Sequence, residues 1–282
     1  MARNFLRLMF VALSGFAFVA LAAGQEPNRA APEKKSPLIV GHRGLLHGAP
    51  ENTLAGFRAC LALRFGFEFD VRRTKDGQLV CLHDETLERT TSGKGRLADL
   101  SFREVQRLDA GSRFDAVFRG EAIPTVEEIL ALVGQQSSDS TLIAVDLKEA
   151  GGGLEEAIVR LAEKHDVLGR LVFIGLTIES PEIRARLRAA NPRVQLARLA
   201  AAPDNVEEVL ADKHADWVYV RYLPQPQQVH RIHEQGKRLF LAGPLVAGSE
   251  PGNWSKAAEL GFDAILTDYP IDLQRQFRGV SQ

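Results

Sequence analysis

The feature that most constrains the fold of this 282-residue chain is a regular alternation of short apolar runs with helix-like segments. Such alternation predicts β/α units, in which each helix carries the chain back to begin the next parallel strand. Nine runs are strand-like, at residues 38–40, 67–73, 78–84, 142–145, 171–176, 194–200, 217–222, 238–243 and 264–270. Helices are expected at residues 54–65, 125–134, 154–165, 181–190, 205–213, 227–236 and 255–261, the second of them ending at Gly134.

The third run cannot belong to the parallel series. Parallel neighbours need a crossover of about a dozen residues, and only the turn at Asp76 and Gly77 precedes residues 78–84. This run must return antiparallel, as a β-hairpin extension of the second strand. The remaining strands match a (β/α)8 TIM barrel, with residues 85–121 as a short insertion or lid after strand two. An open doubly wound sheet is the alternative, but no GxGxxG follows any strand.

The hairpin carries a first candidate site. Glu68 and Asp70 are two residues apart on a strand, so both carboxylates face the same side. A two-residue turn at Asp76-Gly77 would pair residues symmetrically about it, which places His83 directly across from Asp70. Buried like charges need a cation or a proton to compensate them. The stretch therefore indicates a divalent-metal site beside a histidine, with a surface hairpin of solvated charges as the alternative.

Charged side chains of both signs follow the first three barrel strands, at the end where such barrels carry their active sites. They are His42, Arg43, Glu68, Asp70, Asp146 and Lys148, with His83 delivered by the hairpin. Three carboxylates suit Ca²⁺ or Mg²⁺, and two histidines suit acid–base catalysis near neutral pH. Arginine and lysine suit phosphate oxygens. Together they form a set suited to cleaving a phosphodiester.

The N-terminal residues predict the compartment. Arg3 and Arg7 precede an apolar run that ends near Ala20-Leu21-Ala22, a small-x-small cleavage pattern. We expect residues 1–23 to be a signal peptide, 24–36 a disordered lead-in and 37–282 the barrel domain, exported to a periplasm or secreted. The alternative is an uncleaved N-terminal anchor, although the run is short for a membrane span. No stable span is expected in the mature chain.

The net charge bears on whether the protein binds nucleic acid, and the two cysteines bear on whether it contains a disulfide. The formal net charge of −1 gives no reason to expect a nucleic-acid partner. Cys60 and Cys81 fall on different elements that nothing in the sequence brings together, so we expect two buried thiols and no disulfide. The sequence does not predict the oligomeric state.

Several short motifs, in their order along the chain, resemble the glycerophosphodiester phosphodiesterase family. They are GHRG at 41–44, PENT at 50–53, EFDV at 68–71, TKDG at 74–77, HD at 83–84, LERTT at 87–91, IPT at 123–125 and LTDYP at 266–270. The resemblance implies a TIM barrel that uses one divalent cation, Ca²⁺ or Mg²⁺, to hydrolyse small glycerophosphodiesters to sn-glycerol 3-phosphate and an alcohol. It also implies the roles of single residues: His42 and His83 as catalytic histidines, Arg43 on the phosphate, and Glu68 and Asp70 on the metal.

Two departures from the family pattern leave the substrate open. The family usually has glutamate where Asp146 stands, and a WTVN segment where this chain has residues 240–244. The shorter aspartate can still bind a metal, whereas the missing aromatic and amide change the expected substrate rim. One alternative is phospholipase D-like activity on lysophospholipids that yields a cyclic phosphate, which an apolar rim near residues 240–245 would favour. Another is a barrel that binds a phospho-ligand without catalysis.

Other polar residues are expected to have supporting roles. Glu51 should hold Arg43 or the start of the following helix, and Asp268 should be a hydrogen-bonding residue of the rim. His230 and His233 are three residues apart on one helix, where a solvent-exposed face is the simplest interpretation.

Overall fold

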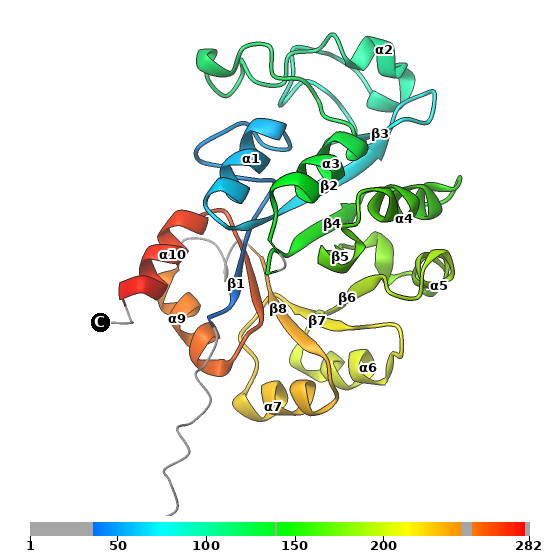
Figure 1. Cartoon of the computed structure of the whole chain (residues 1–282). Coiled ribbons are helices and arrows are strands. Elements are labelled where there is room, and N and C mark those ends of the chain that lie inside the picture. The colour runs from blue at the N-terminus through cyan, green and yellow to red at the C-terminus, as the bar shows by residue number, and fades with distance from the viewer. Residues whose placement is uncertain (1–35, 139, 244–249, 280–282) are drawn as a thin grey trace, which may run out of the picture. The chain divides into compact units, whose positions relative to one another are not determined.

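Parallel strands closed into a barrel form the centre of the molecule, and helices surround it (Figure 1). The structure is a computed structural model that describes residues 36–138, 140–243 and 250–279. Its strands are β1 Leu38–Gly41, β2 Gly66–Arg73, β3 Leu79–Cys81, β4 Ile143–Leu147, β5 Leu171–Ile174, β6 Gln195–Ala200, β7 Trp217–Val220, β8 Arg238–Leu241 and β9 Ala264–Thr267. The sheet runs in the order β1-β9-β8-β7-β6-β5-β4-β2-β3, and pairing of β1 with β2 closes it. The predicted (β/α)8 TIM barrel is therefore confirmed.

The helices that return the chain between strands lie outside the barrel (Figure 1). The α-helices are α1 Leu54–Ala62, α2 Phe102–Val105, α3 Val126–Gln136, α4 Leu154–Lys164, α5 Pro181–Ala190, α6 Val206–Ala211, α7 Pro226–Glu234, α9 Pro251–Leu260 and α10 Pro270–Gly279. Short 3₁₀ turns are η1 Leu97–Asp99, η2 Ala116–Phe118, η3 Leu168–Arg170, η4 Thr177–Glu179 and η5 Pro203–Asn205.

Sequence signals set most helix starts. Thr53 caps α1 by accepting from the Gly56 N–H, and Thr125 forms a capping box with Glu128 at the start of α3. The predicted end at Gly134 was wrong, because α3 continues to Gln136 and Gly134 lies inside it. The chain there is in ordinary helical geometry, and a mid-helix glycine costs only about 1 kcal/mol.

Alternation along β2 divides its side chains between two environments. Phe67 and Phe69 point outward onto the helices, where Phe57 of α1 stacks on Phe67 at a centroid distance of 4.2 Å. Glu68 and Asp70 consequently point into the barrel. Helix packing on the outer face therefore decides which carboxylates reach the interior.

The barrel interior is filled with apolar side chains at the level of β7 and β8. Tyr219 packs edge-to-face on Phe240 with centroids 5.5 Å apart, beside Trp217. Phe240 is fully buried, so it belongs to the core and cannot line the apolar substrate rim that we considered for residues 240–245. The last two residues of that stretch lie outside the described residues.

The hairpin forms as predicted, but its register is shifted by one residue. Its ladder pairs Val71 with Cys81 and Arg73 with Leu79, so the position across from Asp70 is Leu82. The Gly77 N–H donates to the Thr74 carbonyl at 2.9 Å, and Gly77 has φ +86°. This is a type I turn followed by a left-handed glycine, a three-residue loop instead of the expected two-residue one. The predicted direct pairing of His83 with Asp70 was wrong for that reason.

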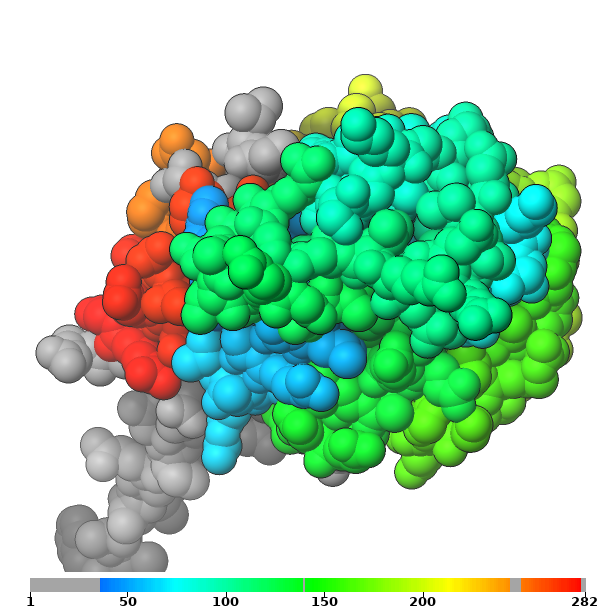
Figure 2. Space-filling model, turned by 90° about the horizontal axis from the view of Figure 1, so that it is seen from above, coloured from blue at the N-terminus to red at the C-terminus, as the bar shows by residue number. Residues whose placement is uncertain are grey.

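Residues 85–121, here called the insertion, form a small unit beside the hairpin (Figure 1). A hydrophobic cluster of its own joins Leu87, Leu97 and Val105 to Val80 and Leu82 of the hairpin. The insertion reaches α1 as well, because the Ala55 N–H donates to the Glu121 carboxylate at 3.0 Å. Figure 2 shows the insertion over a wide part of one face, side by side with the segment that contains α1.

Other expectations concern the cysteines and the membrane. Cys60 on α1 and Cys81 on β3 are buried free thiols, as predicted. None of the helices in the described part of the chain has the length and apolar content needed to cross a bilayer. The predicted signal peptide and nearly all of the predicted lead-in lie outside the described residues.

A glycine at the start of β2 allows a test of how closely β2 packs against the residue that precedes β4. Gly66 faces the β4 side so closely that a Cβ would overlap the Leu142 carbonyl. Gly66→Ala should lower the free energy of unfolding by about 1–3 kcal/mol because the overlapping atom is backbone. Gly169→Ala is the matched control, since nothing lies within 4 Å of its added Cβ. Urea denaturation measures the free energy of unfolding of both variants. Equal stabilities for the two would contradict the close contact between Gly66 and the Leu142 carbonyl.

Candidate active site

Three carboxylates meet at one end of the barrel interior. Strand pairing places Asp70 of β2 directly beside Asp146 of β4, and Glu68 lies two residues earlier on the same face as Asp70. One carboxylate oxygen from each of the three lies within 4.8 Å of the other two. Hard oxygen donors at this spacing fit a divalent cation such as Ca²⁺ or Mg²⁺. All three predicted ligands are thus brought together.

Burial makes this cluster electrostatically costly without a cation. Burial and the neighbouring charges of Asp70 and Asp146 raise the pKa of Glu68 well above its usual value. Burial also raises the pKa of Asp146, although Lys148 opposes the shift. Burial acts on Asp70 in the same direction, but Lys148, Asn52 and Arg43 outweigh it and lower the pKa of that carboxyl. A buried carboxyl pushed toward its neutral form is the state that a bound cation would reverse.

Two cations border the carboxylates. The Lys148 ammonium contacts Asp70 at 2.9 Å and Asp146 at 2.5 Å. Arg43 follows β1 with φ +54°, and its backbone N–H donates to Glu68 at 2.8 Å. The Arg43 guanidinium lies 3.6 Å from Asp70. Both cations predicted to contact phosphate therefore lie at the edge of the carboxylate cluster.

The two histidines reach this region from different elements, and each is held by a carboxylate. His42 follows β1, and its Nδ1 lies 2.6 Å from Asp268, which follows the neighbouring strand β9. The Nδ1 of His83 lies 2.7 Å from Asp84. A carboxylate on Nδ1 orients the ring and leaves Nε2 as the nitrogen for proton transfer.

His83 reaches the site although it does not pair across from Asp70. Arg72 anchors it, donating from Nε and Nη2 to the His83 carbonyl at 2.9 and 2.8 Å. Burial raises the pKa of Asp146, and the ring is close enough for its positive charge, when protonated, to oppose that rise. His83 lies beyond the last residue of β3, so hairpin alternation does not dictate where its side chain points.

Asn52 is a site residue that the sequence analysis named only as part of a motif. Its amide donates to Asp70 at 2.7 Å, and its carbonyl accepts from the Asp70 N–H and the Cys81 thiol. Asn52 has φ +56°, a conformation that asparagine tolerates better than most residues. The sequence signal that could have identified Asn52 as a site residue is its position in the PENT motif, between Glu51 and the helix cap Thr53.

Polar residues with expected supporting roles behave as predicted. Arg43 donates to Glu51 at 3.1 Å, and Asp268 is the hydrogen-bond partner of His42. His230 and His233 are exposed on the outer helix α7 and lie beside Glu234 and Asp263. Both are far in sequence from the carboxylate cluster.

Comparisons with known proteins point to one family. Residues 42–272 match the model of the glycerophosphoryl diester phosphodiesterase family. The chain is similar to a Bacillus subtilis glycerophosphodiester phosphodiesterase, 31% identical over 96% of this chain and 97% of that protein. An enzyme of the same name from Caldanaerobacter subterraneus is 37% identical over 48% of this chain, and the chain spans about half, 56%, of that relative. The structure resembles an Oleispira antarctica phosphodiesterase solved with the product sn-glycerol-3-phosphate, with TM-score 0.70, 26% identity, and 86% and 97% of the two chains covered.

Gly175 tests whether the position of Asp146 controls metal binding. It follows β5 with φ +93°, and a Cβ there would overlap the Asp146 carboxylate. Gly175→Ala should weaken Ca²⁺ or Mg²⁺ binding at least about tenfold in calorimetric titration, because the carboxylate must move. Gly151→Ala is the control, as it has φ +78° with open space around the added Cβ. Wild-type metal affinity in Gly175→Ala would show that Asp146 is not a ligand.

Proposed function

The chain belongs to the glycerophosphoryl diester phosphodiesterase family and is an enzyme of that class, and we propose that it hydrolyses small glycerophosphodiesters to sn-glycerol 3-phosphate and an alcohol. One observation carries the proposal: the largely buried cluster of Glu68, Asp70 and Asp146 contacts two cations, at the end of the barrel to which two carboxylate-held histidines are attached. The product named with the Oleispira structure supports the proposed product here.

We assign the cluster of three carboxylates to one divalent cation, Ca²⁺ or Mg²⁺. Glu68, Asp70 and Asp146 would hold it, with Asn52 orienting Asp70 from outside. When bound, the cation supplies positive charge next to the phosphoryl oxygens, which favours attack at phosphorus. The shorter aspartate at 146 remains compatible with this role because Gly175 leaves room for its carboxylate.

Arg43 and Lys148 would hold the phosphate itself. The Arg43 side chain is mostly buried and its guanidinium can approach two phosphate oxygens in one plane. The Lys148 ammonium can turn from the carboxylates toward a third oxygen because its four-carbon stem is flexible. Both charges would offset the negative charge that grows on the phosphoryl oxygens in the transition state.

Proton transfer would fall to the two histidines. One of them takes the proton of the nucleophile, which is water or the glycerol 2-hydroxyl, and the other donates a proton to the departing alkoxide. Attack by water gives sn-glycerol 3-phosphate directly, whereas attack by the 2-hydroxyl gives a cyclic phosphate that a water molecule must then open. Asp268 and Asp84 would stabilise the imidazolium formed on His42 or His83 through their hydrogen bonds to Nδ1. Each ring needs this support because it must alternate between neutral and charged forms.

We also propose that the mature protein is exported. The basic n-region with Arg3 and Arg7, the apolar run and the small-x-small pattern after it support removal of residues 1–23. N-terminal sequencing of protein recovered from the cell envelope or medium tests this, and an intact N-terminus on all recovered chains would contradict it.

Histidine variants test the catalytic assignment. His42→Ala and His83→Ala should each lower kcat on glycerophosphocholine by about 10²–10⁴-fold, because each removes one proton-transfer group. His230→Ala is the matched control on an exposed helix face and should keep wild-type turnover. Assays with Ca²⁺, Mg²⁺ and EDTA, read by phosphorus NMR, also separate sn-glycerol 3-phosphate from a cyclic phosphate. Wild-type turnover in either active-site variant would refute the assignment.

Lys148→Met separates phosphate binding from metal binding. It should lower kcat/KM by about 10–100-fold, since charged hydrogen bonds contribute about 1.5–3 kcal/mol. The same change should tighten Ca²⁺ or Mg²⁺ binding, because the ammonium no longer competes for Asp70 and Asp146. Lys164→Met is the control, because the Lys164 side chain is exposed at the last residue of α4. Weaker metal binding in Lys148→Met would contradict this arrangement.

A further inference from the structure

One arginine of the insertion connects two parts of the proposed active site. The Arg89 Nε donates to Asp84 at 2.5 Å. Its Nη1 and Nη2 donate to the two carboxylate oxygens of Glu51 at 2.6 and 2.9 Å. A planar guanidinium presents its donors in a rigid fork, so these three bonds hold the two carboxylates in one fixed relative geometry.

Each carboxylate then holds a residue of the site. Glu51 accepts from the Arg43 guanidinium at 3.1 Å, and Asp84 binds the His83 imidazole at 2.7 Å. Arg43 comes from the loop after β1, whereas His83 comes from the far end of the hairpin. A continuous series of side-chain contacts therefore runs from the phosphate-binding cation to a catalytic histidine through Arg89.

This series differs from an ordinary surface ion pair. The Glu51 side chain is only 14% exposed, and the pKa of its carboxyl is low because Arg89 and Arg43 outweigh the effect of burial. Hydrogen bonding from Arg89, together with His83, lowers the pKa of Asp84 to about 2. By contrast, Arg96 and Glu85 in the same insertion form a single contact with side chains 59% and 57% exposed, a type of pair that contributes little.

We propose that Arg89 is a positioning residue, which sets the separation and orientation of Arg43 and His83 from outside the barrel. The proposal rests on the proposed function, in which those two residues bind phosphate and transfer a proton. It also gives the insertion a role, since residues 85–121 then complete the site instead of only covering the hairpin.

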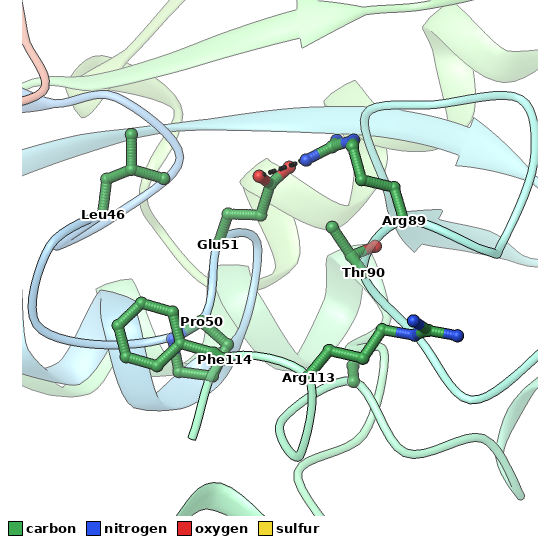
Figure 3. Close-up of a pocket in the computed structure, with 8 residues that line it drawn as sticks. Leu46, Pro50, Glu51, Arg89, Thr90, Arg113 and Phe114 are labelled. Atoms are coloured by element: carbon green, nitrogen blue, oxygen red, sulfur yellow. Dashed lines mark hydrogen bonds and ion pairs between the residues drawn. The ribbon is translucent and has the colours of Figure 1, made fainter.

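A pocket beside this contact makes the proposal testable by chemical rescue. Figure 3 shows Glu51 and Arg89 facing each other at one side of a space bordered by Leu46, Phe114 and Arg113. The pocket has a volume of about 170 Å³ and Arg89 lines it, with 46% of its side chain exposed. Free guanidinium could therefore enter the space that Arg89→Ala would leave and bridge the same two carboxylates.

The experiment compares three variants of the full chain with wild type. Arg89→Ala should lower kcat/KM by about 10–100-fold, the range for outer-shell residues that orient metal ligands, because Arg89 orients its two groups in the same indirect way. Arg89→Lys should recover only a small part, because an ammonium cannot make the forked contact. Arg96→Ala, the matched control, should keep wild-type activity. Millimolar guanidinium should restore activity at least about tenfold in Arg89→Ala and leave wild type and Arg96→Ala unchanged.

Either of two results with Arg89→Ala would overturn the proposal: a folded variant with turnover within about twofold of wild type, or a loss that guanidinium does not reduce. If Arg89→Ala does not fold, Arg89→Lys carries the test, and full activity in that variant refutes the forked contact. Nitrogen-15 NMR of the His83 ring adds a readout independent of turnover. The Nδ1-protonated form should dominate in wild type and Arg96→Ala and be lost in Arg89→Ala, while an unchanged ring would overturn the proposal. A wild-type protein that is inactive on glycerophosphodiesters would refute the proposed function, and the NMR signal of the His83 ring would still test the role of Arg89.

Discussion

The pairing of β2 with β4 is the interaction on which the site depends. It places Asp70 beside Asp146 at one level of the barrel, while the outward phenylalanines of β2 are buried against helices. The inward face therefore has to carry the carboxylates. Burying three such groups together raises the pKa of Glu68 and requires positive charge nearby. Lys148 and Arg43 supply part of that charge, and the proposed cation would supply the remainder.

The histidines show a second level of organisation around this cluster. His42 is held by Asp268 across the junction of β1 and β9, where closure of the barrel brings together residues from the two ends of the chain. His83 is held by its neighbour Asp84, which in turn depends on Arg89 of the insertion. The barrel thus orients one histidine by itself, and it relies on a segment outside the barrel for the other.

Sequence patterns were sufficient for the barrel and for most of the side chains in the candidate site, but they did not assign roles to Asn52 or Arg89. The β/α alternation identified the parallel strands, and turn length excluded residues 78–84 from the barrel. Strand ends then picked out Glu68, Asp70, Asp146 and the two cations, because functional groups of such barrels lie at that rim. Contacts between residues far apart in the chain could not be predicted, since no local sequence pattern links Asp268 to His42 or Arg89 to Glu51.

By itself, the sequence determined the fold class, the family and the residues that gather at the carboxyl ends of the strands, because periodicity and motif order are local properties of the chain. Tertiary structure decided the rest. It set the hairpin register through the left-handed Gly77, placed Phe240 in the core instead of on the rim, and joined Glu51 to Asp84 through Arg89. These outcomes depend on loop geometry and on contacts between segments far apart in the chain, and only packing of the whole barrel fixes them.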